Sequence, residues 1–410
     1  MEGKRLIRSI RLKNLLSFGS EGEEIELEPL NVLIGRNASG KSNLIDSIAL
    51  LHKAPTNFAN TIRQGGGISE WLWKGSEPNP IAEIEIATEH PKEKSPLRHK
   101  ISFTRVGQRL EIVEESIEYE YFNAADSNTA TQQVYRYQDG KVEFLPGQVI
   151  SEKDIEFSSG IAMLTGRKGL PENLLSKLDE SVLSKIKLPN QHPEIAYLAI
   201  MLEQIKIYKH WDTERNSSLR RPQSVDLPDD FLLEDASNLS LVLNDLHLKR
   251  ANKKIVNNLK EFYNEVEDYS TKIQGGTVQI FIHEEGLSQP IPATRLSDGT
   301  LRYLCLLTIL CHPSPPPLVC IEEPELGLHP DVLHTVAKLL IEASQRTQLI
   351  VTTHSDILVD ALSETPEAIL VCERDADGTH FRRLERDILK EWLEKYSLGE
   401  LWRMGEIGAV

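Results

Sequence analysis

The stretch that decides the fold is Gly35-Arg36-Asn37-Ala38-Ser39-Gly40-Lys41-Ser42, which has the pattern G-x-x-x-x-G-K-[ST]. Residues 30–34 before it predict a buried strand, and residues 43–51 after it carry apolar side chains at helical spacing. A strand, a glycine loop and a helix in this order predict a phosphate-binding loop, because backbone N–H groups and the helix N-terminus then point at anionic oxygens. A glycine-rich turn without a ligand is the alternative, and the flanking elements argue against it.

Two side chains of this P-loop (residues 35–42) have expected roles in binding a nucleotide. Lys41 is expected to reach the β- and γ-phosphates, and the hydroxyl of Ser42 is expected to bind Mg²⁺. The glycines Gly35 and Gly40 let the backbone approach the phosphates closely. The sequence therefore predicts a site for ATP and Mg²⁺, and the loop alone does not exclude GTP.

Composition places the chain among ordinary globular proteins. It has 410 residues, 40% of them hydrophobic, and 62 acidic against 46 basic side chains give a net charge of −16. This charge argues against wholesale electrostatic wrapping of nucleic acid but leaves room for a local basic groove. The four cysteines form no C-x-x-C pair, so we expect buried reduced thiols. The absence of a leader and of a long apolar run predicts a cytoplasmic protein with no membrane partner.

The chain divides into three predicted regions. Residues 1–152 hold the P-loop and, between 81 and 145, a period-two pattern that predicts antiparallel strands, with Asp139-Gly140 as a hairpin turn. Residues 153–275 are expected to form a helical insertion, with one helix face running from Ile195 to Tyr208 and another from Val256 to Tyr269. Residues 276–410 are expected to alternate strands and helices again.

A second group of candidate residues lies at the end of a predicted buried strand, Leu318-Val319-Cys320-Ile321-Glu322-Glu323. Because successive strand residues point to opposite faces, the two carboxylates are expected to have different roles. Glu322 is expected to hold the Mg²⁺ shell, and Glu323 to act as general base for the attacking water. An exposed acidic strand end is the plainer alternative.

Two further motifs complete the set. In Leu296-Ser297-Asp298-Gly299-Thr300, Ser297 and Gly299 are expected to form an anion site at a helix N-terminus, although Ser297 is also a good capping residue. His354 follows the apolar strand 349–351, where α/β proteins bind ligands, and is expected to contact the γ-phosphate and the water. A structural histidine is the alternative.

These four motifs in this order resemble the ATP-binding-cassette (ABC) class of P-loop ATPases, and within it the RecF/SMC-like group. More narrowly, the chain resembles the predicted AAA-type ATPases related to the OLD family, in the segment Ile10–Asn14, in 322–330 and in the tail from Leu398. The resemblance implies an α/β fold: an ABC-type ATPase head with a mixed sheet, an antiparallel β subdomain and a helical insertion. It is weak across residues 60–275.

The resemblance also implies an ATPase that forms a head-to-tail homodimer around two ATP molecules. The signature loop (residues 296–300) of one subunit would cap the ATP on the P-loop of the other, so that Ser297 contacts a γ-phosphate in trans. The loop 325–330 would line the dimer interface.

The sequence departs from the family pattern at several points. The first acid of the acidic strand is usually Asp and is here Glu322, so a different metal geometry and slow turnover are expected. Gln148 is the candidate for the glutamine loop that senses Mg²⁺. The insertion is too short for an SMC coiled-coil arm, and the residues after His354 are too few for the TOPRIM nuclease domain of OLD proteins. Asp375 and Asp377 fit a hairpin turn better than a nuclease centre.

Three functions remain open at this point. The first is an ATP-driven regulator of a separate effector, such as a TOPRIM-type nuclease, in defence against phage or plasmid DNA. The second is a RecF-like repair ATPase that binds DNA, for which the chain offers a basic cluster, although a solvated helix face explains the cluster as well: Lys249, Arg250, Lys253, Lys254 and Lys260. The third is a transporter ATPase subunit, which the inserted regions disfavour.

Overall fold

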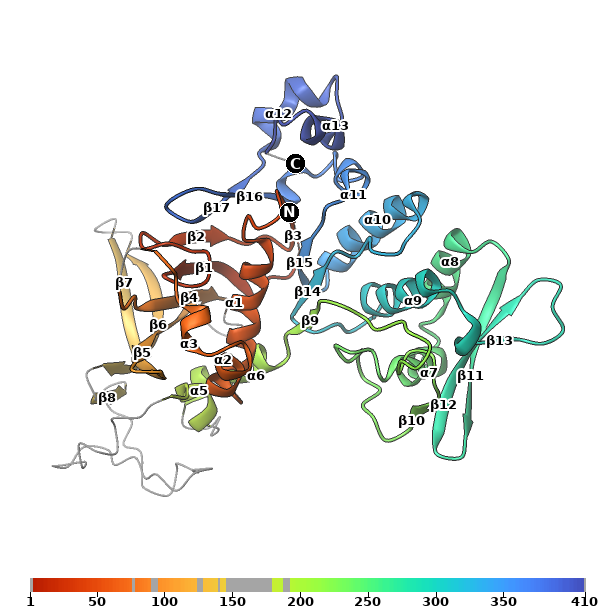
Figure 1. The fold of residues 1–410 in the computed structure, drawn as a ribbon, viewed down its shortest axis with the longest axis horizontal. Helices are drawn as coiled ribbons and strands as arrows, with labels where there is room; N and C mark the ends of the chain where they lie inside the picture. Colours follow the sequence, from red (N-terminus) through yellow and green to blue (C-terminus); the bar gives the residue numbers. More distant parts are fainter. Residues whose placement is uncertain are drawn as a thin grey trace.

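The computed structural model describes residues 3–75, 78–89, 95–123, 128–138, 141–144, 179–186 and 192–408, of which 121–123 and 128–130 are described for the backbone only. Figure 1 shows a central sheet with an antiparallel sheet and α1–α3 to one side, and α7–α9 with a small sheet to the other. The segment with α11, α12 and α13 lies beyond the edge of the central sheet (Figure 1).

The central sheet carries the candidate site. Its strand order is β17-β16-β3-β15-β14-β9, and all neighbours are parallel except the hairpin β16–β17. The bounds are β3 Leu30–Ile34, β9 Lys206–Tyr208, β14 Leu318–Glu322, β15 Gln348–Thr352, β16 Ile369–Arg374 and β17 Thr379–Arg383. In an open parallel sheet, ligands bind at the carboxyl ends of the strands. The P-loop, Glu322 and the segment before His354 all leave the sheet at that edge.

Both faces of the central sheet are covered, which is why its inner strands β3, β14 and β15 are largely apolar. Side chains alternate between two cores: Leu33, Cys320 and Ile350 face one that includes α1, whereas Val32, Ile321 and Val351 face one that includes α9. The helix α1 spans Lys41–Lys53 and α9 spans Asp298–Leu310. The P-loop helix therefore packs between the central sheet and the antiparallel sheet, since the strands β1 and β4 contribute to the same core.

The period-two pattern between 81 and 145 does form antiparallel strands. The strand order is β2-β1-β4-β5-β6-β7-β8, and each pair of neighbours is antiparallel. The bounds are β1 Ile7–Lys13, β2 Glu23–Glu26, β4 Ala82–Thr88, β5 Leu97–Val106, β6 Arg109–Asn123, β7 Asn128–Gln138 and β8 Lys141–Phe144. The predicted turn Asp139-Gly140 lies outside the described residues. The helices α2 Phe58–Gln64 and α3 Ile68–Trp71 lie beside this sheet.

The expected helical insertion is wrong in two places. The helix expected to run to Tyr208 ends at Glu203, and β9 pairs with β14, so residues within 153–275 enter the central sheet. The helix expected to run to Tyr269 ends at Phe262 (α8 Lys253–Phe262), and β11 (Val266–Gln274) pairs with β12 (Thr277–Glu284). Tertiary strand pairing overrides the local helical periodicity in both. The other elements here are α5 Val182–Lys185, α6 Pro193–Glu203, β10 Gln223–Ser224, α7 Leu239–Leu248 and β13 Ile291–Pro292.

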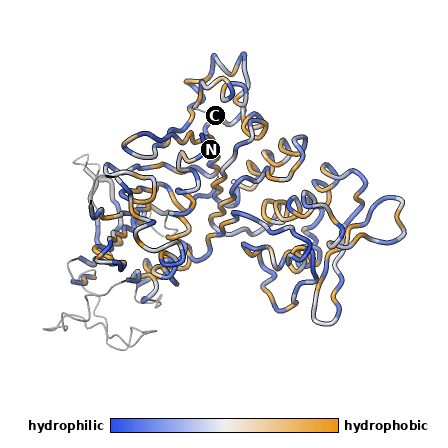
Figure 2. The backbone as a smooth tube through the Cα atoms, in the orientation of Figure 1, coloured by the Kyte–Doolittle hydropathy of each residue, from blue (hydrophilic) through white to orange (hydrophobic). Residues whose placement is uncertain are grey.

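The last part of the chain alternates helices and strands as expected. Its helices are η1 Ala293–Arg295, η2 Pro330–Val332, α10 Leu333–Ser344, α11 Asp356–Asp360, η3 Pro366–Ala368, α12 Arg386–Leu393 and α13 Leu398–Arg403. Figure 2 shows hydrophobic residues concentrated along the central strands. Within the described residues, no helix is both long and apolar enough to cross a membrane. All four cysteines are free and buried, as predicted.

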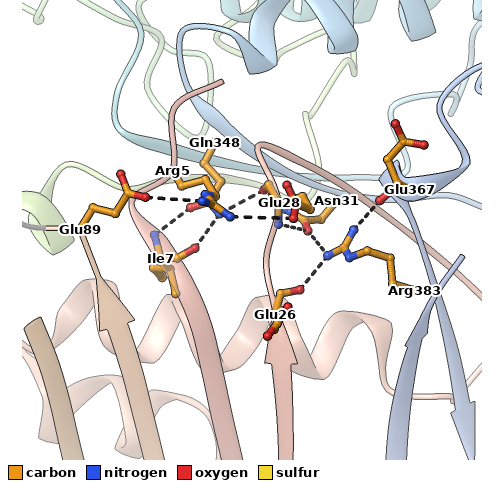
Figure 3. A network of polar contacts seen from close by, with 9 residues as sticks. All are labelled: Arg5, Ile7, Glu26, Glu28, Asn31, Glu89, Gln348, Glu367 and Arg383. Atoms are coloured by element: carbon orange, nitrogen blue, oxygen red, sulfur yellow. Dashed lines mark hydrogen bonds and ion pairs between the residues drawn. The ribbon is translucent and has the colours of Figure 1, made fainter. Parts of the chain in front are cut away.

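A polar network ties the two larger sheets together at the edge opposite the candidate site. Gln348, the first residue of β15, accepts hydrogen bonds from the backbone N–H groups of Leu6 (3.1 Å) and Ile7 (2.9 Å) and donates to Ile7 O (2.8 Å). Arg383 donates to the backbone oxygen of Glu26 and to Asn31 Oδ1, both at 2.7 Å (Figure 3). Because these donors and acceptors satisfy one another, they hold the two sheets together at the edge opposite the candidate site.

Candidate functional site

The P-loop has the strained backbone that its glycines predict. Gly35 has φ 140° and Gly40 has φ 116°, a left-handed range that other residues rarely adopt. A Cβ on Gly35 would lie 2.2 Å from Cys372 O, and one on Gly40 would lie 2.3 Å from Thr379 Oγ1. The hairpin β16–β17 therefore supports the loop so closely that only glycine fits at both positions.

The top of the loop is open to solvent. Arg36, Asn37 and Ala38 are exposed, whereas Ser39 and Gly40 beneath them are buried. Ala38 has φ 62°, which adds a second strained turn. The hydroxyl of Ser39 is buried and has no hydrogen-bond partner among the described residues, a group that phosphate oxygens could satisfy. The loop thus combines a helix N-terminus, an exposed backbone turn and an unsatisfied donor.

The side chain of Lys41 folds back onto the start of its own P-loop. Its Nζ donates to Gly35 O at 2.7 Å and to Arg36 O at 3.0 Å, and the residue is 6% exposed. Burial lowers the pKa of Lys41, although nearby Cys372 and Glu323 act in the other direction. An ammonium held by two carbonyl oxygens can transfer to stronger anionic acceptors when a phosphate enters.

Glu322 and Ser42 meet across the end of the central sheet. Ser42 Oγ donates to Glu322 Oε2 at 3.4 Å, and burial raises the pKa of Glu322. Glu322 Oε1 is buried without a hydrogen bond in the described part of the chain. A hydroxyl and a carboxylate are hard oxygen ligands that suit Mg²⁺, which takes its remaining ligands from phosphates and water. The two residues therefore fit a nucleotide-bound Mg²⁺. No group of three or more acidic, histidine or cysteine side chains within the described ranges forms a metal site by itself.

Glu323 has surroundings different from those of Glu322. Its backbone is left-handed (φ 48°), and its N–H donates to Thr352 O (3.0 Å) and Thr352 Oγ1 (3.2 Å). This turn carries the side chain out of the strand direction, so that Glu323 Oε1 lies 3.8 Å from His354 Nε2. Burial and the charge of Lys41 lower the pKa of His354. A neutral imidazole beside a carboxylate suits proton transfer or positioning of water.

Glu325 is a site residue that sequence reasoning placed only in the loop 325–330. Its Oε1 accepts hydrogen bonds from Thr353 Oγ1 (2.8 Å) and from the backbone N–H of His354 (2.7 Å). Burial raises the pKa of Glu325. The carboxylate therefore fixes the backbone that carries the histidine.

The signature loop forms the N-terminal end of α9. Ser297 caps α9: its Oγ accepts from Thr300 N at 3.0 Å, and the residue is exposed. A Cβ on Gly299 would lie 2.8 Å from Gly327 O, so this loop packs against the loop 325–330. Among the described residues, the hydrogen bonds of Ser297 and the nearest neighbours of Gly299 include no P-loop residue. The P-loop, Glu322, Glu323 and His354 come together, whereas the contacts of Ser297 and Gly299 within the described part of the chain do not reach the P-loop.

Arg220 supports the signature loop and was missed because an isolated arginine in a polar loop carries no motif. The residue is 9% exposed, and its guanidinium donates to Thr213 O (2.7 Å) and Leu296 O (2.6 Å) and pairs with Asp298. These contacts hold the loop from both sides of Ser297.

Lys209 was missed for a similar reason. It follows β9, and its ammonium pairs with Asp46 of α1 and lies 3.6 Å from Glu322 Oε1. The expected glutamine loop residue, Gln148, lies outside the described residues. Nothing in the local sequence around Lys209 indicates that β9 will pair with β14.

Two other candidate sites have simple structural explanations. Asp375 Oδ1 accepts from the N–H groups of Asp377 (2.9 Å) and Gly378 (3.2 Å), as in the predicted hairpin turn. In the basic cluster, Lys249 pairs with Asp245 at 2.6 Å and Lys254 pairs with Glu342. Two of its five charges are thus already neutralised, which weakens the case for a DNA groove.

Comparison with known proteins agrees with this geometry at the level of family and fold. The fold is similar to the SMC head bound to the C-winged helix domain of ScpA, at 14% identity, a TM-score of 0.54 and coverage of 93% of this chain and 99% of that one. It is also similar to the SMC head domain with an extended coiled coil bound to the C-terminal domain of ScpA from Pyrococcus furiosus, at 15% identity, a TM-score of 0.53 and coverage of 95% and 99%. No curated protein sequence matches the chain.

A family model matches residues 30–152 and 175–360, which include the P-loop, Glu322, Glu323 and His354. The family match confirms the predicted AAA-type P-loop ATPase, and the solved structures confirm a fold like that of SMC heads. The chain belongs to the P-loop ATPase family described as "AAA domain, putative AbiEii toxin, Type IV TA system".

Proposed function

We propose that this chain is an ATP-hydrolysing head that dimerises around two ATP molecules and regulates a separate effector in defence against phage or plasmid DNA. One observation carries the proposal: within a chain, the phosphate loop and the acidic residues share one site, whereas Ser297 is exposed on a loop with no contact to the P-loop among its described hydrogen bonds. A second copy would supply this loop, as the family resemblance implies.

Each residue of the site has a separate role in the proposed hydrolysis. Lys41 leaves its two carbonyl oxygens and binds the β- and γ-phosphates, and the P-loop backbone orients the triphosphate. Ser42 and Glu322 would hold Mg²⁺, which would neutralise charge at the phosphates. Glu323 accepts a proton from the attacking water, and His354 positions that water and the γ-phosphate. Ser297 and Gly299 of the partner close the site and exclude solvent.

The proposed domain division follows the same logic. Residues 1–152 and 276–410 form the two lobes of the head, and 153–275 form the insertion, although β9 from this insertion is part of the central sheet. The loop 325–330 packs against the signature loop through Gly327 and Gly299, which suits a shared interface.

The proposed effector is a separate partner protein. The family description names a toxin–antitoxin system, and two similar SMC heads are bound to domains of a separate protein, ScpA. A partner protein such as a TOPRIM-type nuclease would convert ATP-driven closure into cleavage of DNA.

The test uses the Glu323→Gln variant, which keeps the shape of the side chain but removes the base. With ATP and Mg²⁺, light scattering coupled to size exclusion should give the mass of two chains, and without nucleotide the mass of one. Lys41→Met in the same background should stay monomeric. An unchanged mass with bound ATP would overturn dimerisation. For defence, expression together with the neighbouring open reading frame should lower phage plating, and Lys41→Met should abolish this effect.

A further inference from the structure

Lys209 places a positive charge where the proposed function requires Mg²⁺. β9 pairs with β14 in parallel register, with Tyr208 beside Ile321. Lys209, which follows β9, therefore comes beside Glu322, the last residue of β14. The Lys209 ammonium lies 3.6 Å from Glu322 Oε1, the oxygen that has no hydrogen bond in the described chain. Lys209 is therefore the counter-charge of this carboxylate in the absence of nucleotide.

Asp46 gives the same ammonium a second partner. It stands one helical turn after Ser42 on α1, so both side chains face the end of β14. Its carboxylate forms the shorter of the two ion pairs with Lys209. A lysine has a flexible stem and a compact charge, which allows the ammonium to keep one carboxylate while it leaves the other.

Mg²⁺ and the ammonium cannot both occupy the space beside Glu322. A divalent ion bound to Ser42 and Glu322 would lie within a few ångströms of Lys209, where like charges repel strongly in a partly buried site. We propose that Lys209 is a tethered competitor of Mg²⁺: it neutralises Glu322 in the empty site and withdraws to Asp46 when Mg²⁺ enters with ATP. Lys209 would thereby set the Mg²⁺ concentration that nucleotide binding requires. This inference rests on the proposed nucleotide site.

The test measures binding of a fluorescent N-methylanthraniloyl-ATP to the full chain across a series of free Mg²⁺ concentrations. Lys209→Met keeps the length of the side chain without its charge, and it should lower the Mg²⁺ midpoint about fivefold, as expected for loss of a partly exposed ion pair. Lys209→Arg should leave the midpoint near that of the wild type. Lys206→Met, on the same strand, is the matched control and should leave it unchanged.

Asp46→Asn should shift the Mg²⁺ midpoint in the opposite direction from Lys209→Met. Without Asp46, Lys209 has only Glu322 as partner, so the Mg²⁺ midpoint should rise. If Asp46 acts through Lys209, the double variant Asp46→Asn/Lys209→Met should have the midpoint of Lys209→Met, to within about twofold. Asp46→Asn alone keeps the test usable if Lys209→Met folds poorly.

The outcomes separate the two proposals. Loss of Mg²⁺ dependence in the wild type, or a midpoint that is unchanged or raised in Lys209→Met, overturns the role of Lys209. Failure of the wild type to bind the nucleotide, or full binding by Lys41→Met, overturns the nucleotide site itself.

Discussion

The carboxylate of Glu325 accepts a hydrogen bond from the backbone N–H of His354 at 2.7 Å, and the same oxygen accepts from Thr353 Oγ1 at 2.8 Å. Glu325 belongs to the loop that follows the acidic strand, and His354 follows the next strand in the sheet. The loop proposed to line the dimer interface is therefore bonded directly to the backbone of the proposed catalytic histidine. A shift of this loop on dimer formation would therefore move His354.

Replacing Glu325 should slow hydrolysis without weakening nucleotide binding. Glu325→Ala leaves two donors unpaired and displaces His354, so we expect kcat to fall roughly tenfold and the free energy of unfolding to fall by about 2 kcal/mol. Glu325→Gln keeps an acceptor oxygen and should retain most activity. Steady-state kinetics and nucleotide titration distinguish the two effects. Wild-type kcat in Glu325→Ala would contradict this role.

The two P-loop glycines should be indispensable to folding of the site. Gly35→Ala and Gly40→Ala combine a left-handed backbone with Cβ contacts of 2.2 and 2.3 Å. We expect each to lower the free energy of unfolding by about 3 kcal/mol and to abolish ATP binding. Gly275→Ala is the matched control, because Gly275 has φ 59° but no atom within 4 Å of the added Cβ. It should cost only about 1 kcal/mol, as chemical denaturation can show.

Arg220 should affect dimerisation more than nucleotide binding. Arg220→Lys cannot make the three directed contacts to Thr213, Leu296 and Asp298, so the signature loop loses its support. In the Glu323→Gln background we expect ATP-driven dimerisation to weaken roughly tenfold, with unchanged nucleotide affinity of the monomer. Arg221→Lys is the control, since Arg221 is exposed and its guanidinium donates to Asn216 Oδ1 at 2.6 Å, away from the signature loop. Equal effects of both variants would contradict the prediction.

Acid should destabilise the fold through its buried histidines. Burial lowers the pKa of His52, His192 and His312. Between each lowered value and the ordinary pKa of about 6.5, the unfolded chain binds a proton that the folded chain does not. Stability should therefore fall as the pH drops below about 6.5.

The variant His52→Gln tests this dependence. His52 Nδ1 lies 2.9 Å from Leu202 O, and Lys53 Nζ lies 3.0 Å from His52 Nε2, which suits a neutral ring. The decrease in melting temperature from pH 7.5 to pH 5.5 should be smaller in this variant than in the wild type. His210→Gln, at an exposed position, should leave the decrease unchanged.

Local sequence was sufficient to predict some parts of this molecule. The strand 30–34, the P-loop and the helix from Lys41 to Lys53 are consecutive, so their pattern contains the whole unit. The alternation in 81–145 likewise predicts half-buried strands without knowledge of their partners. The residues that meet at the site through strand order were harder to foresee.

The errors occur where a distant segment decides the structure. Residues 266–269 fit a helix by the positions of Val266 and Tyr269, yet they pair with β12 as part of β11. Lys209 and Arg220 gain their contacts only because β9 joins β14 and because the loop 213–220 lies against Leu296. These contacts join residues that are far apart in sequence, so no short segment of the chain predicts them.

The order of strands in the central sheet has a consequence for biosynthesis. β3 leaves the ribosome well before its neighbours in the sheet, β15 and β16, and Asn31 bonds to Leu349 O, 318 positions later in the chain. Until those strands have been made, the P-loop lacks both the sheet that positions it and the hairpin that supports Gly35 and Gly40. Contacts so distant in sequence are slow to form. A nascent chain would therefore remain unable to bind ATP until β15, β16 and β17 have been made.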